Sequence, residues 1–265
     1  MSDQNPAEPS SHPRTLVIIP TYNEAENLEW IISRVRDAAP EVEILVADDN
    51  SPDGTGEIAD RLAAADGHVH VMHRRNKQGL GAAYLAGFDW GLDHGYDALI
   101  EMDADGSHQP EDLPRLIARL ADADLVIGSR YVRGGGVENW PLYRQLISRG
   151  GSLWTRLMLG IKTRDATGGF RVFRRETLEG IGLDEVASAG YCFQVDLLWR
   201  TLKRGFRVVE VPITFVERER GNSKMSKAIF IEALIRTTLW GIAHRAEQLR
   251  DAGEKALENR EKRRT

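Results

Sequence analysis

The sequence lacks several features that mark common classes of protein. Its one cysteine, Cys192, rules out a disulfide within the chain and suits a reducing compartment. It has no uncharged run of about 18 residues, so we predict no transmembrane helix. Residues 1–13 are polar, include proline and serine, and lack the apolar run of a secretory signal. We expect them to form a disordered leader.

Motifs for the common nucleotide cofactors are also missing. The sequence has no Walker A motif, and residues 79–84 only half-match a dinucleotide-binding fingerprint because the third glycine is absent. A nicotinamide or ATP site is therefore not expected. His68, His70 and His73 alternate along a predicted strand without the spacing of zinc ligands, and we interpret them as structural.

What is present fits one compact α/β domain. Of the 265 residues, 42% are hydrophobic and 28% are charged, which is ordinary for a globular protein. The net charge of −5 hides a basic segment, since ten lysines or arginines and two acids, Glu138 and Asp165, lie between Arg130 and Arg175. Aromatic and aliphatic residues mixed into it suit an anionic lipid surface or a phosphate-bearing substrate. A solvated helix with a core-facing stripe would give the same pattern.

Predicted strands and helices alternate along the chain. Apolar, β-branched runs predict strands at 15–19, 42–47, 68–73, 98–102, 125–127, 170–173 and 207–211. Helical patterns begin near residue 23, pass through 58–62, and cover 81–92, 110–120, 192–203 and 224–244. The short connections predict an open, mostly parallel sheet with helices on both faces.

Polar clusters that include acidic residues follow three of the predicted strands, at 20–24, 48–53 and 103–105. Open α/β sheets bind ligands beyond the carboxyl ends of their strands, and carboxylates that converge there repel one another unless a cation compensates. Asp103 and Asp105 therefore form a candidate site for a hard divalent ion, Mg²⁺ or Mn²⁺, that also holds phosphates.

Candidate phosphate-binding cations lie later in the chain. Arg130 follows the predicted strand at 125–127, while Arg218 and Lys224 flank the segment 221–223. Such cations bind phosphate oxygens and stabilise a departing diphosphate.

Several motifs resemble those of a known family. Residues 17–27, 48–55 and 102–110 resemble family 2 glycosyltransferases with the Rossmann-like GT-A fold. The resemblance narrows to dolichol- or polyprenol-phosphate mannose synthases through residues 128–131, 147–150, 168–171, 190–194, 211–215 and 218–224. It extends from Arg14 to Ala243 and implies a GT-A domain at 14–245, followed by a charged tail at 246–265.

The resemblance also implies roles for individual residues. The donor nucleoside would be held by Pro20, Tyr22, Glu24, Ala47 and Asp49. The diphosphate-sugar would contact Asp103, Ala104 and Asp105, with Asp105 and Ser107 as metal ligands. Serine is a weaker ligand than the glutamine that some relatives have at this position. Donor phosphates would be bound by Arg130, Arg218 and Lys224, and the acceptor phosphate by Arg130 and Arg149. Asp105, Arg218 and Lys224 would carry catalysis.

The implied reaction is an inverting transfer of mannose from GDP-mannose to a polyprenyl phosphate. The acceptor phosphate is ionised at neutral pH, so the enzyme must supply alignment and charge neutralisation, not a strong base. Asp196 would orient a sugar hydroxyl or remain an ordinary surface carboxylate. Three alternatives stay open: UDP-glucose as donor, a nucleotidyltransferase that forms pyrophosphate, and a membrane-surface adaptor without catalysis. The nucleotidyltransferase is disfavoured because no glycine-rich loop follows the first strand.

Membrane contact is expected through residues 140–162 and 225–243. The last predicted helix is apolar but interrupted by Glu232 and Arg236, which favours an amphipathic helix on a membrane or on the core. We expect a peripheral protein on the cytoplasmic face of a membrane. A membrane-embedded partner protein is compatible with the sequence but not required by it, and no nucleic-acid partner is expected.

Overall fold

The computed structural model describes residues 13–186, 191–217, 234–246 and 250. The strands are β1 (Thr15–Thr21), β2 (Glu43–Asp48), β3 (Val69–His73), β4 (Ala98–Glu101), β5 (Leu125–Ser129), β6 (Gly136–Glu138), β7 (Arg171–Arg174), β8 (Val208–Pro212) and β9 (Thr214–Val216). The helices are α1 (Leu28–Ala38), α2 (Thr55–Ala65), α3 (Leu80–Asp93), η1 (Pro110–Asp112), α4 (Leu113–Ala118), η2 (Arg119–Asp122), α5 (Leu142–Leu159), α6 (Arg175–Ile181), η3 (Leu183–Glu185) and α7 (Tyr191–Lys203). Residues 234–246 are also helical.

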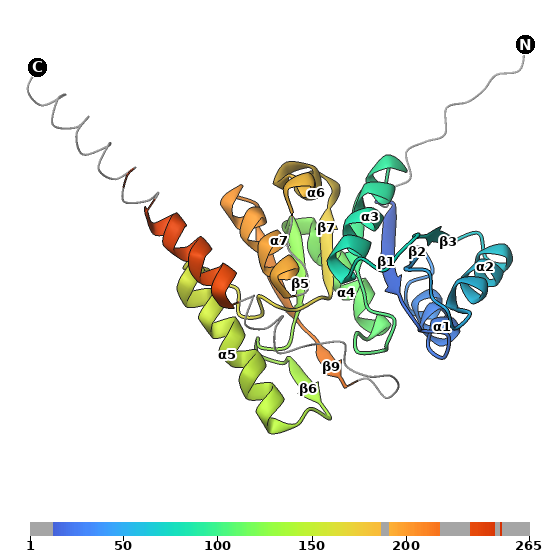
Figure 1. Cartoon of the computed structure of the whole chain (residues 1–265), viewed down its shortest axis with the longest axis horizontal. Helices are drawn as coiled ribbons and strands as arrows, with labels where there is room; N and C mark the ends of the chain where they lie inside the picture. The colour runs from blue at the N-terminus through green and yellow to red at the C-terminus, as the bar shows by residue number, and fades with distance from the viewer. Residues whose placement is uncertain (1–12, 187–190, 218–233, 247–249, 251–265) are drawn as a thin grey trace, which may run out of the picture.

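In the described part of the chain, seven strands form one sheet in the order β3-β2-β1-β4-β7-β5-β8 (Figure 1). Strand β7 is antiparallel to both of its neighbours, and the other pairs are parallel. The carboxyl ends of β1, β2, β4, β5 and β8 therefore share one edge of the sheet, and the chain enters β7 from that same edge. This confirms the predicted mostly parallel α/β architecture.

Apolar side chains pack on both faces of the sheet because successive strand residues point to opposite sides. In β1, Val17 and Ile19 pack with α1 residues on one face, whereas Leu16 and Ile18 pack with α3 residues on the other. All four side chains are fully buried. The double-sided core holds the strand ends, and the loops that follow them, in fixed relative positions.

Helix α1 begins later than the sequence pattern indicates, at Leu28 instead of near residue 23. The backbone N–H groups of Asn23 and Glu24 donate to Ser51 Oγ and Thr55 Oγ1, each at 3.0 Å. Asn23 also has a φ of 57°, in the left-handed region. The segment is thus fixed as a loop by contacts with the next strand–helix connection, which local sequence cannot reveal.

The basic segment after β5 folds mainly into helix α5. The sequence patterns allowed a helix in this segment but did not give its bounds. Helix α5 lies beside helix 234–246 (Figure 1). Trp154 Nε1 donates to Thr238 Oγ1 at 3.2 Å, and an Arg245 guanidinium N–H donates to Leu157 O at 2.8 Å. Strands β6 and β9 form a small parallel sheet next to it. Within the described ranges, no helix is both long and apolar enough to cross a bilayer.

Candidate functional site

The loop after β1 and the loop after β2 are joined through Asp48. Its carboxylate accepts hydrogen bonds from Thr21 Oγ1 at 2.9 Å and from the hydroxyl and backbone N–H of Ser51 at 2.6 and 3.0 Å. A second carboxylate, Asp53, accepts bonds from Thr55 Oγ1 and from the N–H of Ala25. The two loops therefore form one rigid surface at the sheet edge before any ligand binds.

The residues expected to hold a nucleoside lie on this surface. Pro20 is the second-last residue of β1, and Tyr22 directly follows the strand. Ala47 is buried near the end of β2. Glu24 accepts a 2.9 Å hydrogen bond from Asn27 Nδ2. Lys77, in the loop after β3, places its Nζ 3.7 Å from the centre of the Tyr22 ring. The ring thus has a cation against it that sequence reasoning had not assigned to the site.

Asp49 is the buried charged residue among the expected nucleoside contacts. It is 5% exposed and forms an ion pair with Arg74, whose side chain is also largely buried. Burial raises the pKa of Asp49, and the nearby Arg74 guanidinium opposes that rise without cancelling it. Arg74 therefore compensates a carboxylate that would otherwise be costly to bury.

Asp103 and Asp105 follow β4 and are positioned by different elements. Tyr84, a fully buried residue of α3, donates its hydroxyl to Asp103 Oδ1 at 3.1 Å. Asp105 Oδ1 accepts the backbone N–H of Ser107 at 3.0 Å. Gly106, between Asp105 and Ser107, has a φ of 75°. A Cβ at this position would lie 2.7 Å from the Trp30 ring. The tight turn thus requires glycine.

His108 supports the same turn from beneath. Its Nδ1 accepts the backbone N–H of Asp103 at 3.1 Å, which fixes the neutral form with its proton on Nε2. Burial lowers the pKa of His108, although nearby aspartates oppose the shift. The ring stacks on Phe170 at 4.9 Å between centroids. This histidine therefore positions the Asp103 backbone.

The donor set suits a divalent ion that takes most of its ligands from substrate and water. The described residues contain no group of three or more histidine, cysteine or acidic side chains arranged to hold a metal. Magnesium-type sites in phosphate-handling proteins commonly use one or two carboxylates and complete the shell with phosphate oxygens and water. Asp103 and Asp105 fit that arrangement. The observed contact of Ser107 with Asp105 is through its backbone N–H.

Arg130 lies at the end of β5 and is held by Asp165. Two of its side-chain N–H groups donate to the two carboxylate oxygens, each at 2.7 Å, and its backbone N–H donates at 2.9 Å. Asp165 is fully buried and Arg130 is 5% exposed. Burial would raise the pKa of Asp165, but the Arg130 guanidinium and its hydrogen bonds bring it below its ordinary value. In the sequence, Asp165 stands out only as one of two acids in a basic segment.

The structure brings Arg130 and Arg149 to the same aromatic ring. Their Cζ atoms lie 5.1 and 5.7 Å from the centre of the Tyr131 ring. Tyr131 donates its hydroxyl to Ser148 Oγ at 2.6 Å, which ties the end of β5 to helix α5. Arg144 lies over Trp140 and pairs with Glu217. These contacts build a cationic, aromatic surface next to the carboxylates of the sheet edge.

Beneath this surface, two ionisable side chains are buried in the core. Glu101 and Arg171 are register partners on β4 and β7, and both are fully buried. Arg171 donates to the carbonyl oxygens of Gly168, Ala166 and Gln194 at 2.6 to 2.9 Å, so it shapes the loop that contains Asp165. Burial raises the pKa of Glu101 to about 8, although Arg171 opposes that rise.

Two of the expected catalytic residues, Arg218 and Lys224, lie outside the described residues, and so do all of residues 225–233 and most of the charged tail. Asp196 is described, on α7. It accepts a 2.9 Å hydrogen bond from Arg200, which also pairs with Glu185. These contacts favour the structural interpretation of Asp196.

Comparisons with known proteins show what the chain as a whole is similar to. A family model for glycosyl transferase family 2 matches residues 16–182. An undecaprenyl-phosphate mannosyltransferase from Micrococcus luteus is 59% identical over 237 residues, covering 89% of this chain and 98% of that protein. A polyprenol monophosphomannose synthase from Mycolicibacterium smegmatis is 58% identical over 249 residues, covering 93% and 94%. A solved mannosyltransferase from Pyrobaculum calidifontis, in complex with GDP-Man and Mn²⁺, has a TM-score of 0.53 at 21% identity, covering 94% of this chain and 81% of that one.

Proposed function

Because this chain belongs to glycosyltransferase family 2, we propose that it transfers mannose from GDP-mannose to a polyprenyl phosphate with inversion at the anomeric carbon. One observation carries the proposal. Asp103 and Asp105 follow β4 and Arg130 follows β5, at the edge shared by the carboxyl ends of both strands, and Arg149 lies at the same Tyr131 ring as Arg130. A transferase with two phosphate-bearing substrates needs both groups. The relatives that share 59% and 58% identity bear names that specify polyprenyl acceptors and mannose.

The donor would bind across the loops that follow β1, β2 and β4. Tyr22 and Asp49 offer a ring and a carboxylate to the nucleoside, and Asp103 and Asp105 would hold Mg²⁺ or Mn²⁺. Such an ion would neutralise charge on the diphosphate. The hydrogen bond from Tyr84 to Asp103 keeps that carboxylate in one orientation, so it need not reorganise when donor binds. Arg218 and Lys224 remain candidates for binding the leaving diphosphate.

The acceptor phosphate would bind against Arg130 and Arg149. Its ionised oxygen is already a nucleophile, so the chief task of these residues is to hold it in line with the departing diphosphate. Asp165 fixes the plane of the Arg130 guanidinium, and Tyr131 spaces the two arginines. Single displacement in this geometry inverts the anomeric centre.

A lipid acceptor agrees with the unusual orientation of α5. This helix buries small or polar residues such as Gly151, Ser152 and Thr155. Most of its large apolar residues, apart from the buried Leu159, are exposed instead: Leu142, Tyr143, Leu146, Ile147, Leu153, Trp154 and Leu157. Helix 234–246 adds Ile235, Leu239 and Ile242. An apolar face of this kind marks an interaction surface, and we propose that it rests on the cytoplasmic face of a membrane. A membrane-embedded partner protein would compete for the same face.

The test offers purified protein a polyprenyl phosphate, Mg²⁺ or Mn²⁺, and labelled GDP-mannose or UDP-glucose in separate reactions. Label in the lipid phase from GDP-mannose alone, lost with EDTA, is the expected result. Transfer from UDP-glucose alone would replace the donor but keep the mechanism. Vesicle binding without transfer from either donor would contradict the proposal and favour the adaptor.

A further inference from the structure

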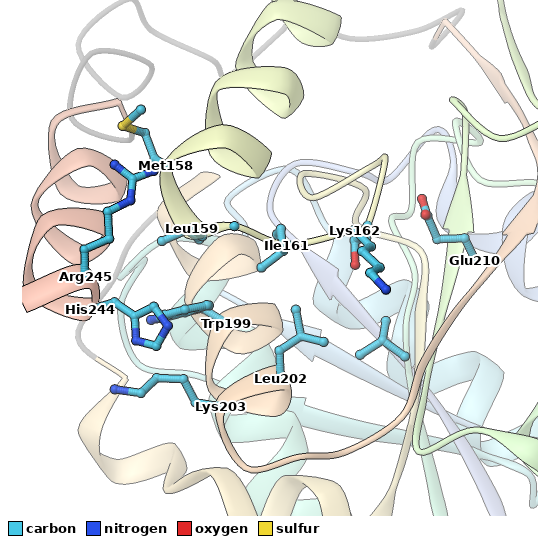
Figure 2. A pocket seen from close by; sticks show the side chains of 13 residues that line it. Met158, Leu159, Ile161, Lys162, Trp199, Leu202, Lys203, Glu210, His244 and Arg245 are labelled. Atoms are coloured by element: carbon cyan, nitrogen blue, oxygen red, sulfur yellow. The ribbon is translucent and has the colours of Figure 1, made fainter. Parts of the chain in front are cut away.

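A cavity of about 660 Å³ lies along the edge strand β8, away from the carboxylates of the candidate site. Its walls come from the end of α5, the connection at 160–163, helix α7, strand β8 and the end of helix 234–246 (Figure 2). The volume falls within the range of ordinary small-molecule pockets. Lys203 is the last residue of α7 and Val208 the first of β8, so the cavity extends toward the amino-terminal edge of the parallel strands.

The cavity combines an apolar wall with basic side chains. Figure 2 shows Leu159, Ile161 and Leu202 between Lys162 on one side and His244 and Arg245 on the other. Trp199 adds an aromatic surface, with its ring 4.7 Å from that of His244. An apolar wall bordered by cations favours a ligand that has an anionic head and a hydrocarbon part.

One acid, Glu210, lines the cavity beside these basic side chains. Glu210 Oε1 accepts hydrogen bonds from Ser129 Oγ at 2.7 Å and from the N–H of Asp165 at 2.9 Å, while Oε2 accepts the N–H of Arg164 at 2.8 Å. Both oxygens are therefore committed to the protein. Glu210 keeps its charge, but the lining still holds three basic side chains, Lys162, Lys203 and Arg245, against this one acid.

The cavity borders the ends of the two helices that carry the exposed apolar face. Met158 and Leu159 line it, and Leu157, one position earlier on α5, is 58% exposed on that face. Arg245 lines the cavity and donates to Leu157 O. A molecule drawn from a membrane under α5 would thus meet the basic residues first with its head group.

We propose that this cavity binds an anionic phospholipid, with the phosphate near Lys162, Lys203 and Arg245 and the first methylenes against Leu159, Ile161 and Leu202. The site is separate from the acceptor-phosphate residues Arg130 and Arg149, which do not line it. A bound lipid would fix α5 and helix 234–246 relative to the sheet. Specific lipid binding would then orient the protein on a membrane.

The test uses short-chain lipids below their micelle concentrations, so that membrane adsorption does not contribute. The whole protein is titrated by calorimetry with dihexanoylphosphatidylglycerol, dihexanoylphosphatidylcholine and inorganic phosphate. We expect phosphatidylglycerol to bind about tenfold more tightly than either of the others, because it alone satisfies both the cations and the apolar wall. Equal binding of phosphatidylcholine, or binding of phosphate alone with equal strength, would overturn the proposal.

Two variants and a matched control locate the binding. Lys162→Ala should weaken phosphatidylglycerol binding about fivefold. The control, Arg164→Ala, removes an exposed charge two residues away that does not line the cavity, and it should change the phosphatidylglycerol affinity less than twofold. Leu202→Trp fills the cavity without altering charge and should abolish binding. Near-ultraviolet circular dichroism checks that each variant is folded. Equal losses in Lys162→Ala and Arg164→Ala would show nonspecific attraction and refute the site. Transfer activity is not the readout, so this result stands apart from the proposed reaction.

Discussion

Arg130 and Asp165 form a buried pair in which both carboxylate oxygens accept guanidinium N–H groups at 2.7 Å. Asp165→Asn keeps the shape but removes the charge that compensates Arg130. Breaking a buried pair on one side costs about 3–5 kcal/mol, so we expect lower stability, measured by urea unfolding. We also expect a larger rise in the KM for polyprenyl phosphate than in that for GDP-mannose. Thr167→Val, which removes a single 3.0 Å contact to Arg130, is the milder control. Equal changes in both KM values would contradict the positioning role.

Removing the Asp105 carboxylate should abolish transfer while leaving the fold intact. Asp105→Ala takes away charge that holds the metal and diphosphate, and we expect a rate loss of roughly a thousandfold or more. Ser107→Ala keeps the backbone N–H that contacts Asp105 and should lower the rate only a few-fold. Transfer rates with added Mg²⁺ or Mn²⁺ make the comparison. Retained activity in Asp105→Ala would refute the metal assignment.

Tyr84→Phe isolates the hydrogen bond that orients Asp103. The ring of Tyr84 is fully buried and stacks on Phe193 with 6.2 Å between centroids, so phenylalanine preserves the packing. We expect a stability loss of about 1 kcal/mol and a weaker apparent affinity for the metal. Metal titration of the transfer rate measures the second effect. An unchanged metal dependence would mean that Tyr84 acts on packing alone.

Glu101 should make stability fall as pH rises. Burial raises its pKa to about 8 in the folded protein, above the ordinary value of 4.5, so the folded state binds the extra proton between these values. Its contribution to stability is therefore present below about pH 4.5 and is lost as pH rises through 8. Glu101→Gln keeps a partner for Gln194, whose Nε2 donates to Glu101 Oε1 at 3.2 Å. The Glu101→Gln variant should lose the fall in stability between about pH 4.5 and 8 that Glu101 causes. An unchanged dependence would show that Glu101 is ionised in the fold.

Polar substitution on the exposed face of α5 should separate membrane binding from folding. Leu153 and Leu157 are 52% and 58% exposed, so Leu153→Ser with Leu157→Ser should change the free energy of unfolding by about 1 kcal/mol or less. Binding to lipid vesicles should fall several-fold in a flotation assay. Leu80→Ser alters a residue 46% exposed on α3 and serves as the control. Equal losses of vesicle binding would exclude α5 as the contact surface.

The sequence by itself determined the alternating strands and helices of a mostly parallel sheet, and its motifs, by their resemblance to family 2 glycosyltransferases, predicted the GT-A fold that the family match confirms. Apolar, β-branched runs such as 15–19 form strands whose two faces must both be covered by other parts of the protein. Strands of this kind, alternating with helices along the chain, predict a mostly parallel sheet. Short motifs likewise identified the acidic turn at Asp103 and Asp105, because glycine and carboxylates at a strand end leave few local alternatives. The assignment of the individual site residues remains a prediction.

Only the tertiary structure decided how those residues are held. Asp165 lies 35 positions after Arg130 in the chain, and Tyr84 lies 19 positions before Asp103, yet each pair is in contact. No local pattern encodes such pairs. Asp165 precedes β7, which enters the sheet between β4 and β5, and Tyr84 lies on α3, which packs against β1 and β4. The orientation of α5 was also a tertiary outcome. Its sequence has an apolar and a polar stripe, but only packing against the domain shows that the apolar stripe faces outward.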